Sequence, residues 1–147
     1  MPDCTFYNLG TSQPRDRYHL ACRIAEKAYK QGQKVFILTS AEDHMQTQTI
    51  DNLLWSFRQG SFVPHQTVGN DSQVPAEQLP NTVLIGTDPR GCMATVLINL
   101  THQVPDNIDA YQRIVEIVDQ DQQIKQAGRQ RYKTYQTNNI QLTTHHI

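Results

Sequence analysis

The chain has 147 residues and a formal net charge of −1, a length that buries a hydrophobic core without disulfides or a structural metal. The near-neutral balance argues against a protein built mainly to coat nucleic acid, because basic residues dominate such domains. No apolar stretch approaches the roughly 20 residues that span a bilayer, and the N-terminal residues lack a secretory pattern, so we expect a cytoplasmic protein with one domain over residues 1–147.

The first part of the chain predicts strands and helices in alternation. Residues 5–9 favour a strand, and small and apolar residues recur at helical spacing over residues 14–32, where a glycine ends the helix. Residues 34–38 form a continuous apolar run typical of a strand buried on both faces, which predicts a βαβ unit with parallel strands. Ser40 and the acidic residue three positions later resemble a capping box, which predicts that a second helix begins there and ends near Gly60.

The middle of the chain predicts a surface loop and two further strands. Residues 67–80 are polar and contain glycine and proline, as surface loops do. Residues 82–85 and 94–99 are apolar, and the segment between them is too short for the helical crossover that neighbouring parallel strands need. We therefore expect one of these strands to run antiparallel at an edge, in a sheet that is mostly parallel but mixed.

Two more helices are predicted in the last third of the chain. Apolar residues recur at helical spacing over residues 108–118, after Pro105, with Asp106 or Asn107 as the cap. Another helix is predicted over residues 121–136. Together the elements predict an α/β fold with three layers, in which helices flank a mostly parallel sheet.

No motif in the sequence predicts a catalytic residue, a metal or a cofactor. Gly86 and Gly91 have the spacing of a phosphate-binding loop, but Cys92 and Met93 stand where that loop requires a lysine and a hydroxyl residue, which favours a tight turn. None of the six histidines has a cysteine or carboxylate partner at a metal-binding spacing. The cysteines are odd in number and set in apolar segments, and we expect all three to be small buried hydrophobic residues: Cys4, Cys22 and Cys92.

Trp55 points away from the apolar stripe of its predicted helix. At 100° per residue it lies about 140° from Ile50, which belongs to that stripe. Either the tryptophan is covered by residues 61–65 or packs at the edge of the core, or it anchors a protein interface, since tryptophan is enriched at binding hot spots. In the second case the apolar surface beside it continues through Phe62, Val63 and Pro64.

The last predicted helix carries a basic and aromatic face. No acidic residue follows Asp121, and Lys125, Arg129, Tyr132 and Lys133 fall within about 100° on a helical wheel. Three interpretations stay open: a solvated helix, a site for an acidic peptide that ends in an aromatic residue, and a site for single-stranded nucleic acid stacked on the tyrosine.

Two residues of this helix lie off the basic face. Gly128 falls between that face and the side that packs on the body, and a glycine there indicates either close packing or room for a ligand to approach the backbone. Arg131 falls on the packing side, and we expect it to reach solvent along its stem.

Two long segments resemble the chi subunit of bacterial DNA polymerase III: LLWSFRQGSFVPH, from Leu53 to His65, and IKQAGRQRYKTYQ, from Ile124 to Gln136. The opening TFYNL also matches that family, and the order and spacing of these blocks agree over essentially the whole chain. The resemblance implies a single Rossmann-like domain without a nucleotide-binding loop. It also implies a subunit of a DNA-directed DNA polymerase (nucleotidyltransferase) holoenzyme that acts in DNA replication and has no intrinsic activity. At Gly128 the family carries a larger residue.

The resemblance further implies two protein partners, with DNA contacted only indirectly. Chi subunits form a 1:1 heterodimer with the psi subunit, through which they join the clamp loader. They also bind the acidic, phenylalanine-ending C-terminal tail of single-stranded DNA-binding protein. The positions that match the tail-binding motif are Lys125, Arg129, Tyr132 and Lys133, with Val118 on the preceding predicted helix as an apolar wall. Those that match the psi-facing surface are Trp55, Phe62, Val63 and Pro64. The residues alone leave the alternative of a nucleic-acid-binding module that uses the same basic, aromatic helix.

Overall fold

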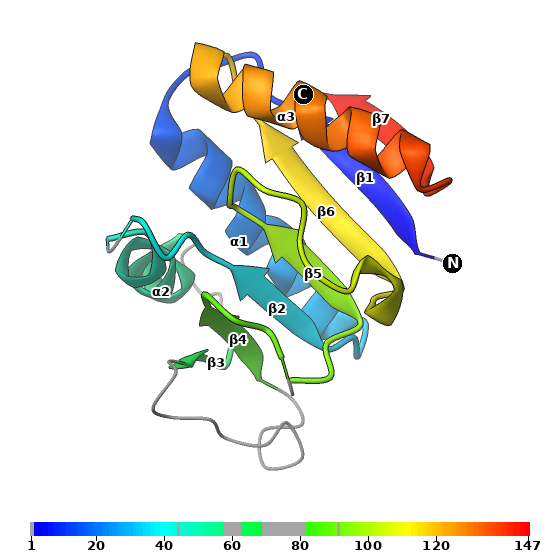
Figure 1. The fold of residues 1–147 in the computed structure, drawn as a ribbon. Coiled ribbons are helices and arrows are strands. Elements are labelled where there is room, and N and C mark those ends of the chain that lie inside the picture. Colours follow the sequence, from blue (N-terminus) through cyan, green and yellow to red (C-terminus); the bar gives the residue numbers. More distant parts are fainter. Residues whose placement is uncertain (1, 44, 58–62, 69–81, 91) are drawn as a thin grey trace.

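One sheet of seven strands runs through the molecule (Figure 1). The computed structural model describes residues 2–43, 45–57, 63–68, 82–90 and 92–147. The strands are β1 (Asp3–Asn8), β2 (Val35–Leu38), β3 (His65–Val68), β4 (Val83–Gly86), β5 (Val96–Asn99), β6 (Arg113–Val118) and β7 (Gln141–His146). The helices are α1 (Pro14–Lys30), α2 (Gln46–Ser56) and α3 (Gln122–Thr137), with one 3-10 turn, η2 (Ile108–Ala110).

The described strands all run parallel, in the order β3-β4-β2-β5-β6-β1-β7. The prediction of a mixed sheet with an antiparallel edge strand is therefore wrong, although β4 and β5 are indeed not neighbours. Strand β2 lies between them, and the described residues of the segment from β4 to β5, 87–90 and 92–95, form no helix. An irregular segment is long enough to connect the two strands because the strand between them, β2, has only four residues and is about 13 Å long.

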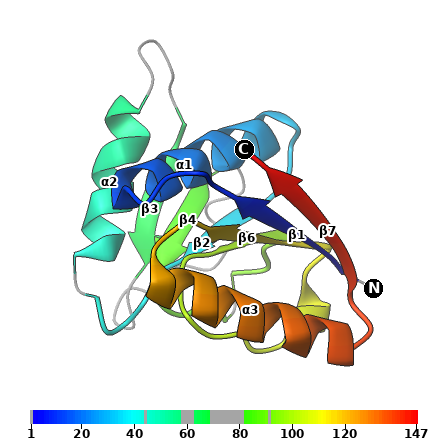
Figure 2. The same cartoon turned by 90° about the horizontal axis from the view of Figure 1, so that it is seen from above.

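Helices cover both faces of the sheet. Figure 2 shows α1 and α2 on one side and α3 on the other, which confirms the predicted three layers. The sequence of β2 fits this arrangement because successive side chains of a strand point to opposite faces. Val35 and Ile37 pack with α1 and α2. Phe36 and Leu38 pack in the second cluster, on the opposite face of the sheet.

The predicted helix over residues 108–118 is wrong. The chain makes only the η2 turn there and then enters β6, a central strand between β5 and β1. Ile114, Val115, Ile117 and Val118 are all buried, the first and last on the α3 face and the middle two on the α1 face. Apolar residues on both faces of a buried strand reproduce the spacing of an amphipathic helix, so the period alone misleads.

The start of α2 also differs from the prediction. The helix begins at Gln46 after Met45, and no side chain caps it. Ser40 and Asp43 instead form turns before the helix: the Ser40 hydroxyl accepts from the amide of Glu42, and the Asp43 carboxylate accepts from the amide of Met45. The predicted helix end near Gly60 and most of the predicted loop over residues 67–80 lie outside the described residues.

Several other predictions are confirmed. The first strand, α1, β2 and α3 all form, and Gly32 follows α1 with a φ of 78°, a left-handed conformation that favours glycine. The three cysteines are free and buried. Over the described ranges, every helix is too short or too polar to cross a membrane.

Candidate functional site on helix α3

Helix α3 starts from a well-formed cap. Asp121 has an extended backbone, and its carboxylate accepts hydrogen bonds from the amides of Gln123 at 3.0 Å and Ile124 at 3.2 Å. Such a cap satisfies amides that the first helical turn leaves unpaired. Asp121 is the last acidic residue of the chain, so the charged residues of α3 itself are all positive.

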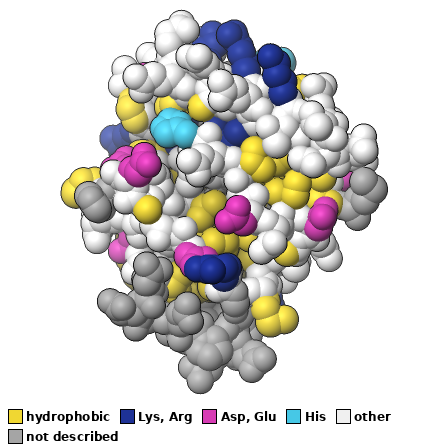
Figure 3. Space-filling model, viewed as in Figure 1, with side chains coloured by type: hydrophobic (Ala, Val, Ile, Leu, Met, Phe, Trp, Pro, Cys, Tyr) yellow, Lys and Arg dark blue, Asp and Glu magenta, His cyan; other side chains and the backbone are white. Residues whose placement is uncertain are grey.

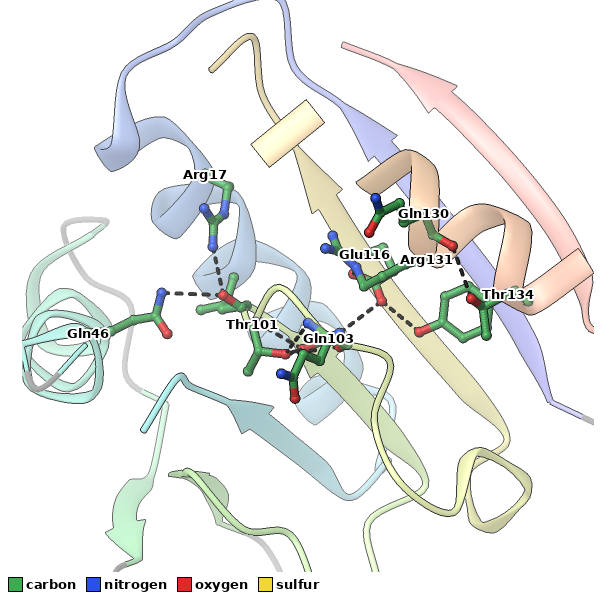
Figure 4. A network of polar contacts seen from close by, with 11 residues as sticks. Arg17, Gln46, Thr101, Gln103, Glu116, Gln130, Arg131 and Thr134 are labelled. Carbon is green, nitrogen blue, oxygen red and sulfur yellow. Dashed lines mark hydrogen bonds and ion pairs between the residues drawn. The ribbon is translucent and has the colours of Figure 1, made fainter. Parts of the chain in front are cut away.

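The inner face of α3 is fixed by a buried carboxylate. Glu116, in β6, is fully buried beneath the helix. It accepts hydrogen bonds from Arg131 Nε at 3.0 Å, from the Tyr135 hydroxyl at 2.6 Å and from Asn99 Nδ2 at 2.9 Å. Burial raises the pKa of Glu116, and the charge of Arg131 together with the three donors opposes that rise. Figure 4 shows this network between β6 and α3.

Arg131 therefore does not reach solvent as predicted. Its side chain is 4% exposed and is held by the Glu116 carboxylate. The helical wheel placed Arg131 correctly on the packing side of α3, but burial requires a charged partner, and that partner lies on a segment for which a helix was predicted. Because β6 was predicted as a helix, the ion pair between Glu116 and Arg131 was not predicted.

The outer face of α3 carries the predicted basic residues. Arg129 and Lys133 are exposed, and Lys125 is half-buried with its Nζ 3.3 Å from Gln120 Oε1. In the described part of the chain, no ion pair neutralises any of these three cations. Figure 3 shows Lys and Arg side chains gathered over α3 at the top of the view. The three cations follow one another at intervals of four residues, about 6 Å along the helix axis.

Tyr132 lies at the boundary between this face and the core. Its ring is half-buried and meets the ring of Phe6 edge-on, with centroids 5.3 Å apart. The contact fixes one edge of the tyrosine and leaves the rest beside the exposed cations. A ring held in this way offers apolar contact area at little further cost in conformational entropy.

Gly128 and Val118 touch where α3 crosses the end of β6. A Cβ added at Gly128 would lie 2.7 Å from Val118 Cγ2, closer than carbon atoms approach in proteins. Of the two interpretations of this glycine, close packing is the one that applies. Val118 is the last residue of β6, not part of a helix, and is 9% exposed. Its side chain lies at the edge of the α3 face.

The residues predicted for the second surface differ in exposure, and one of them belongs to the core. Trp55 is 58% exposed on α2, with its ring centroid 4.5 Å from that of the buried His65 side chain. Pro64 is half-buried, whereas Val63 is 1% exposed and belongs to the core. Phe62 lies outside the described residues. Trp55 thus points off the core, and residue 65 of the following segment packs against one side of it.

A third feature is a hollow of about 930 Å³ at the carboxyl ends of β2, β4 and β5. Ligands of open parallel sheets bind at this edge. Among the described lining residues, however, the one Lys or Arg is Arg90, and its guanidinium is held by Asp88 at 2.7 Å. Glu42 and Asp106 add further carboxylates to the lining. This charge pattern is unfavourable for an anionic nucleotide.

Sequence reasoning missed three residues that shape the α3 site: Glu116, Phe6 and Gln120. Glu116 did leave a signal, since a lone carboxylate in the apolar run RIVEIV requires a buried partner. Phe6 and Gln120 left none, because their contacts to Tyr132 and Lys125 depend on how α3 lies over the sheet.

The fold and the site together define a class of protein: a parallel α/β domain that offers charged and aromatic protein surfaces. Comparison with known sequences is consistent with this class and makes it specific. The profile of a family described as "DNA polymerase III chi subunit, HolC" matches residues 1–143.

Curated relatives match along nearly their whole length. A DNA polymerase III subunit chi from Pseudomonas aeruginosa is 33% identical, covering 97% of this chain and 94% of the relative. The subunit chi of Escherichia coli K12 is 29% identical, covering 98% and 97%. That of Haemophilus influenzae is 30% identical, covering 97% and 95%. The chain belongs to the family of DNA polymerase III chi subunits, which are accessory subunits in DNA replication.

The buried ion pair predicts an asymmetry between two arginines of α3. Arg131→Met leaves Glu116 buried without its cationic partner, and we expect a loss of about 3–5 kcal/mol in the free energy of unfolding. Arg129→Met, two residues away on the exposed face, should change it by less than about 0.5 kcal/mol. The double variant Glu116→Gln/Arg131→Met should recover part of the loss. Urea denaturation measures all three, and equal effects of the two single substitutions would contradict the assignment.

The Gly128 contact predicts that the effect of an added methyl group depends on Val118. In the wild-type background, overpacking by Gly128→Ala should outweigh the gain of about 1 kcal/mol in helix propensity, so the protein is destabilised. In a Val118→Ala background the clash is gone, and the same substitution should stabilise. The measurement is a double-mutant cycle by thermal or chemical denaturation. A substitution that stabilises both backgrounds equally would show that the contact is not tight.

Proposed function

We propose that this chain is a non-catalytic adaptor that binds the acidic C-terminal tail of a single-stranded DNA-binding protein on the outer face of α3. The observation that carries the proposal is a row of cations without ion-pair partners among the described residues, beside a half-buried tyrosine. Lys125, Arg129 and Lys133 supply the charges, and Tyr132 supplies the apolar contact. Family membership supports the proposal, since the resemblance implies this motif at these four positions.

The chemistry of the face suits a peptide with carboxylates and a terminal aromatic ring. The guanidinium of Arg129 is planar and pairs with a carboxylate through two parallel hydrogen bonds, whereas the lysines act as point charges on either side. Tyr132 and the edge of Val118 form the apolar side that shelters the terminal ring. The absence of a side chain at Gly128 lets α3 lie close to β6, so that Val118 reaches the edge of this face.

We further propose that Trp55 anchors the contact with a psi subunit in a 1:1 heterodimer, and through it with the clamp loader. An exposed tryptophan backed on one side by His65 buries a large area with few rotatable bonds, which is typical of interface hot spots. Pro64 extends the surface, and Val63 supports it from the core. Phe62, which the resemblance assigns to the same surface, lies outside the described residues.

The positions of the two surfaces support a bridging role. Trp55 lies on α2 and the cationic row on α3, and these helices cover opposite faces of the sheet (Figure 2). Two partners on these helices approach from different sides. The protein then links the polymerase assembly to the protein that coats single-stranded template.

The proposal predicts which arginine controls tail binding. Arg129→Ala removes a charge-assisted contact with a carboxylate, and we expect at least about tenfold weaker binding of an acidic peptide that ends in phenylalanine. Arg23→Ala, an exposed arginine on α1, should bind like the wild type. Added salt should weaken the wild type more than Arg129→Ala. Isothermal titration calorimetry tests this, and equal affinity of Arg129→Ala and wild type would refute the assignment.

A second prediction separates the two surfaces. Trp55→Ala should abolish co-purification with a co-expressed psi subunit and leave the affinity for the tail peptide unchanged. Met93→Ala is the matched control, because Met93 is a similarly exposed apolar residue, 66% accessible, on another part of the surface. Retained co-purification of Trp55→Ala would rule out Trp55 as the anchor, and loss of both partners would point to misfolding.

A further inference from the structure

Helix α1 carries a second row of basic residues, on the face of the molecule opposite α3. Arg15, His19, Arg23 and Lys27 follow one another at intervals of four residues and fall within about 120° on the helix. Arg15, Arg23 and Lys27 are exposed, and His19 is half-buried. Figure 2 shows α1 and α3 on opposite sides of the sheet, so the two rows are separate surfaces.

The charges of this row are not neutralised within the described structure. The helix has five basic residues and only two acidic ones, in a part of the chain that is otherwise acidic. Asp16 accepts a hydrogen bond from the Thr11 hydroxyl at 2.8 Å, and Glu26 pairs with Lys30 at 3.8 Å. Across the described ranges, no ion pair involves Arg15, Arg23 or Lys27.

The row also borders a concave surface. A hollow of about 410 Å³ lies beside the first half of α1, with Arg15, His19 and Arg23 along it. Leu9, Leu20 and Ile147 supply apolar lining, and Asp16 is the acidic residue at this hollow. The His19 ring is held edge-on by Phe57, with centroids 5.9 Å apart. An imidazole beside aliphatic side chains is a surface on which a nucleobase stacks.

We propose that this α1 row is an independent binding surface for the phosphodiester backbone of single-stranded DNA. Arg15, Arg23 and Lys27 lie about 12 and 6 Å apart along the helix axis, multiples of one spacing that match a ligand whose charges repeat at regular intervals. The hollow takes a base from the strand, while Arg15, Arg23 and Lys27 contact phosphates. An acidic peptide is the less suitable ligand, because its charges are irregular and the row has no tyrosine of the kind found on α3.

Binding should be weak and steeply dependent on salt. Three phosphate contacts to a single strand predict a slope of about −2 for the logarithm of the association constant against the logarithm of the salt concentration. The experiment is fluorescence anisotropy of a labelled oligothymidylate of about 16 nucleotides at several salt concentrations. The neutral variant Arg15→Gln/Arg23→Gln/Lys27→Gln should bind at least about tenfold more weakly at low salt and lose most of the slope.

Two matched variants make the result specific. Arg15→Lys/Arg23→Lys/Lys27→Arg keeps the charges and should bind like the wild type. Lys125→Gln/Arg129→Gln/Lys133→Gln neutralises the α3 row and should also keep the affinity for DNA, although it loses the tail peptide. Thermal melts confirm that each variant is folded. The α1 proposal and the α3 proposal can therefore fail separately.

Three results would overturn the α1 proposal. The first is wild-type affinity of the neutral α1 variant, or no binding by the wild type at low salt. The second is loss of DNA binding only in the α3 variant. The third is displacement of the DNA by a polyglutamate of equal charge at equal concentration, which would make an acidic peptide the ligand of this row.

Discussion

A carboxylate buried under α3 is the constraint on which the proposed binding face depends. Glu116 is fully buried, and an ion in that position is very costly unless charged and polar groups surround it. Arg131 and Tyr135, one helical turn apart, supply two of its three hydrogen bonds. They fix the rotation of α3 about its axis. Arg129 and Lys133, each two residues from Arg131, then lie about 200° away from it and face solvent.

The same network reaches the other side of the molecule. Asn99 donates to Glu116 and to the carbonyl of Gln103, and the next residue but one, Thr101, donates to Asn99 Oδ1 (Figure 4). The carbonyl of Leu100 accepts from the buried Arg17 of α1 at 2.9 Å and from Gln46 of α2 at 3.4 Å. Hydrogen bonds in a buried polar network restrict how the elements that carry them can pack. Here one network ties all three helices to the carboxyl end of β5.

The sequence predicted the elements with one dominant pattern and failed where two patterns coincide. The run of residues 34–38 has no helical alternative, and α1 and α3 have clear amphipathic spacing with identifiable ends, so these predictions are confirmed. Residues 113–118 are apolar on both faces, which imitates a helix, and only pairing between β5 and β1 decides for a strand. The all-parallel order likewise depends on β2 lying between β4 and β5, which local sequence does not encode.

For the candidate site, the outer residues of α3 were predictable and their support was not. Helical spacing places Lys125, Arg129, Tyr132 and Lys133 together whatever lies beneath the helix. The burial of Arg131 depends on Glu116, which is 15 residues away and lies on β6, the strand predicted as a helix. The edge strand β7, which completes the sheet beside β1, is mostly polar and exposed and left no apolar pattern to detect.

The central claim is that a fixed inner face of α3 presents a cationic outer face to an acidic peptide tail. The most direct test is heteronuclear NMR of the wild-type protein titrated with the phenylalanine-ending peptide. The account predicts that the largest amide shifts cluster at Lys125, Arg129, Tyr132 and Lys133, with Val118 at the edge. Largest shifts on α1, on α2 or around the hollow at the carboxyl ends of β2 and β4 would contradict it.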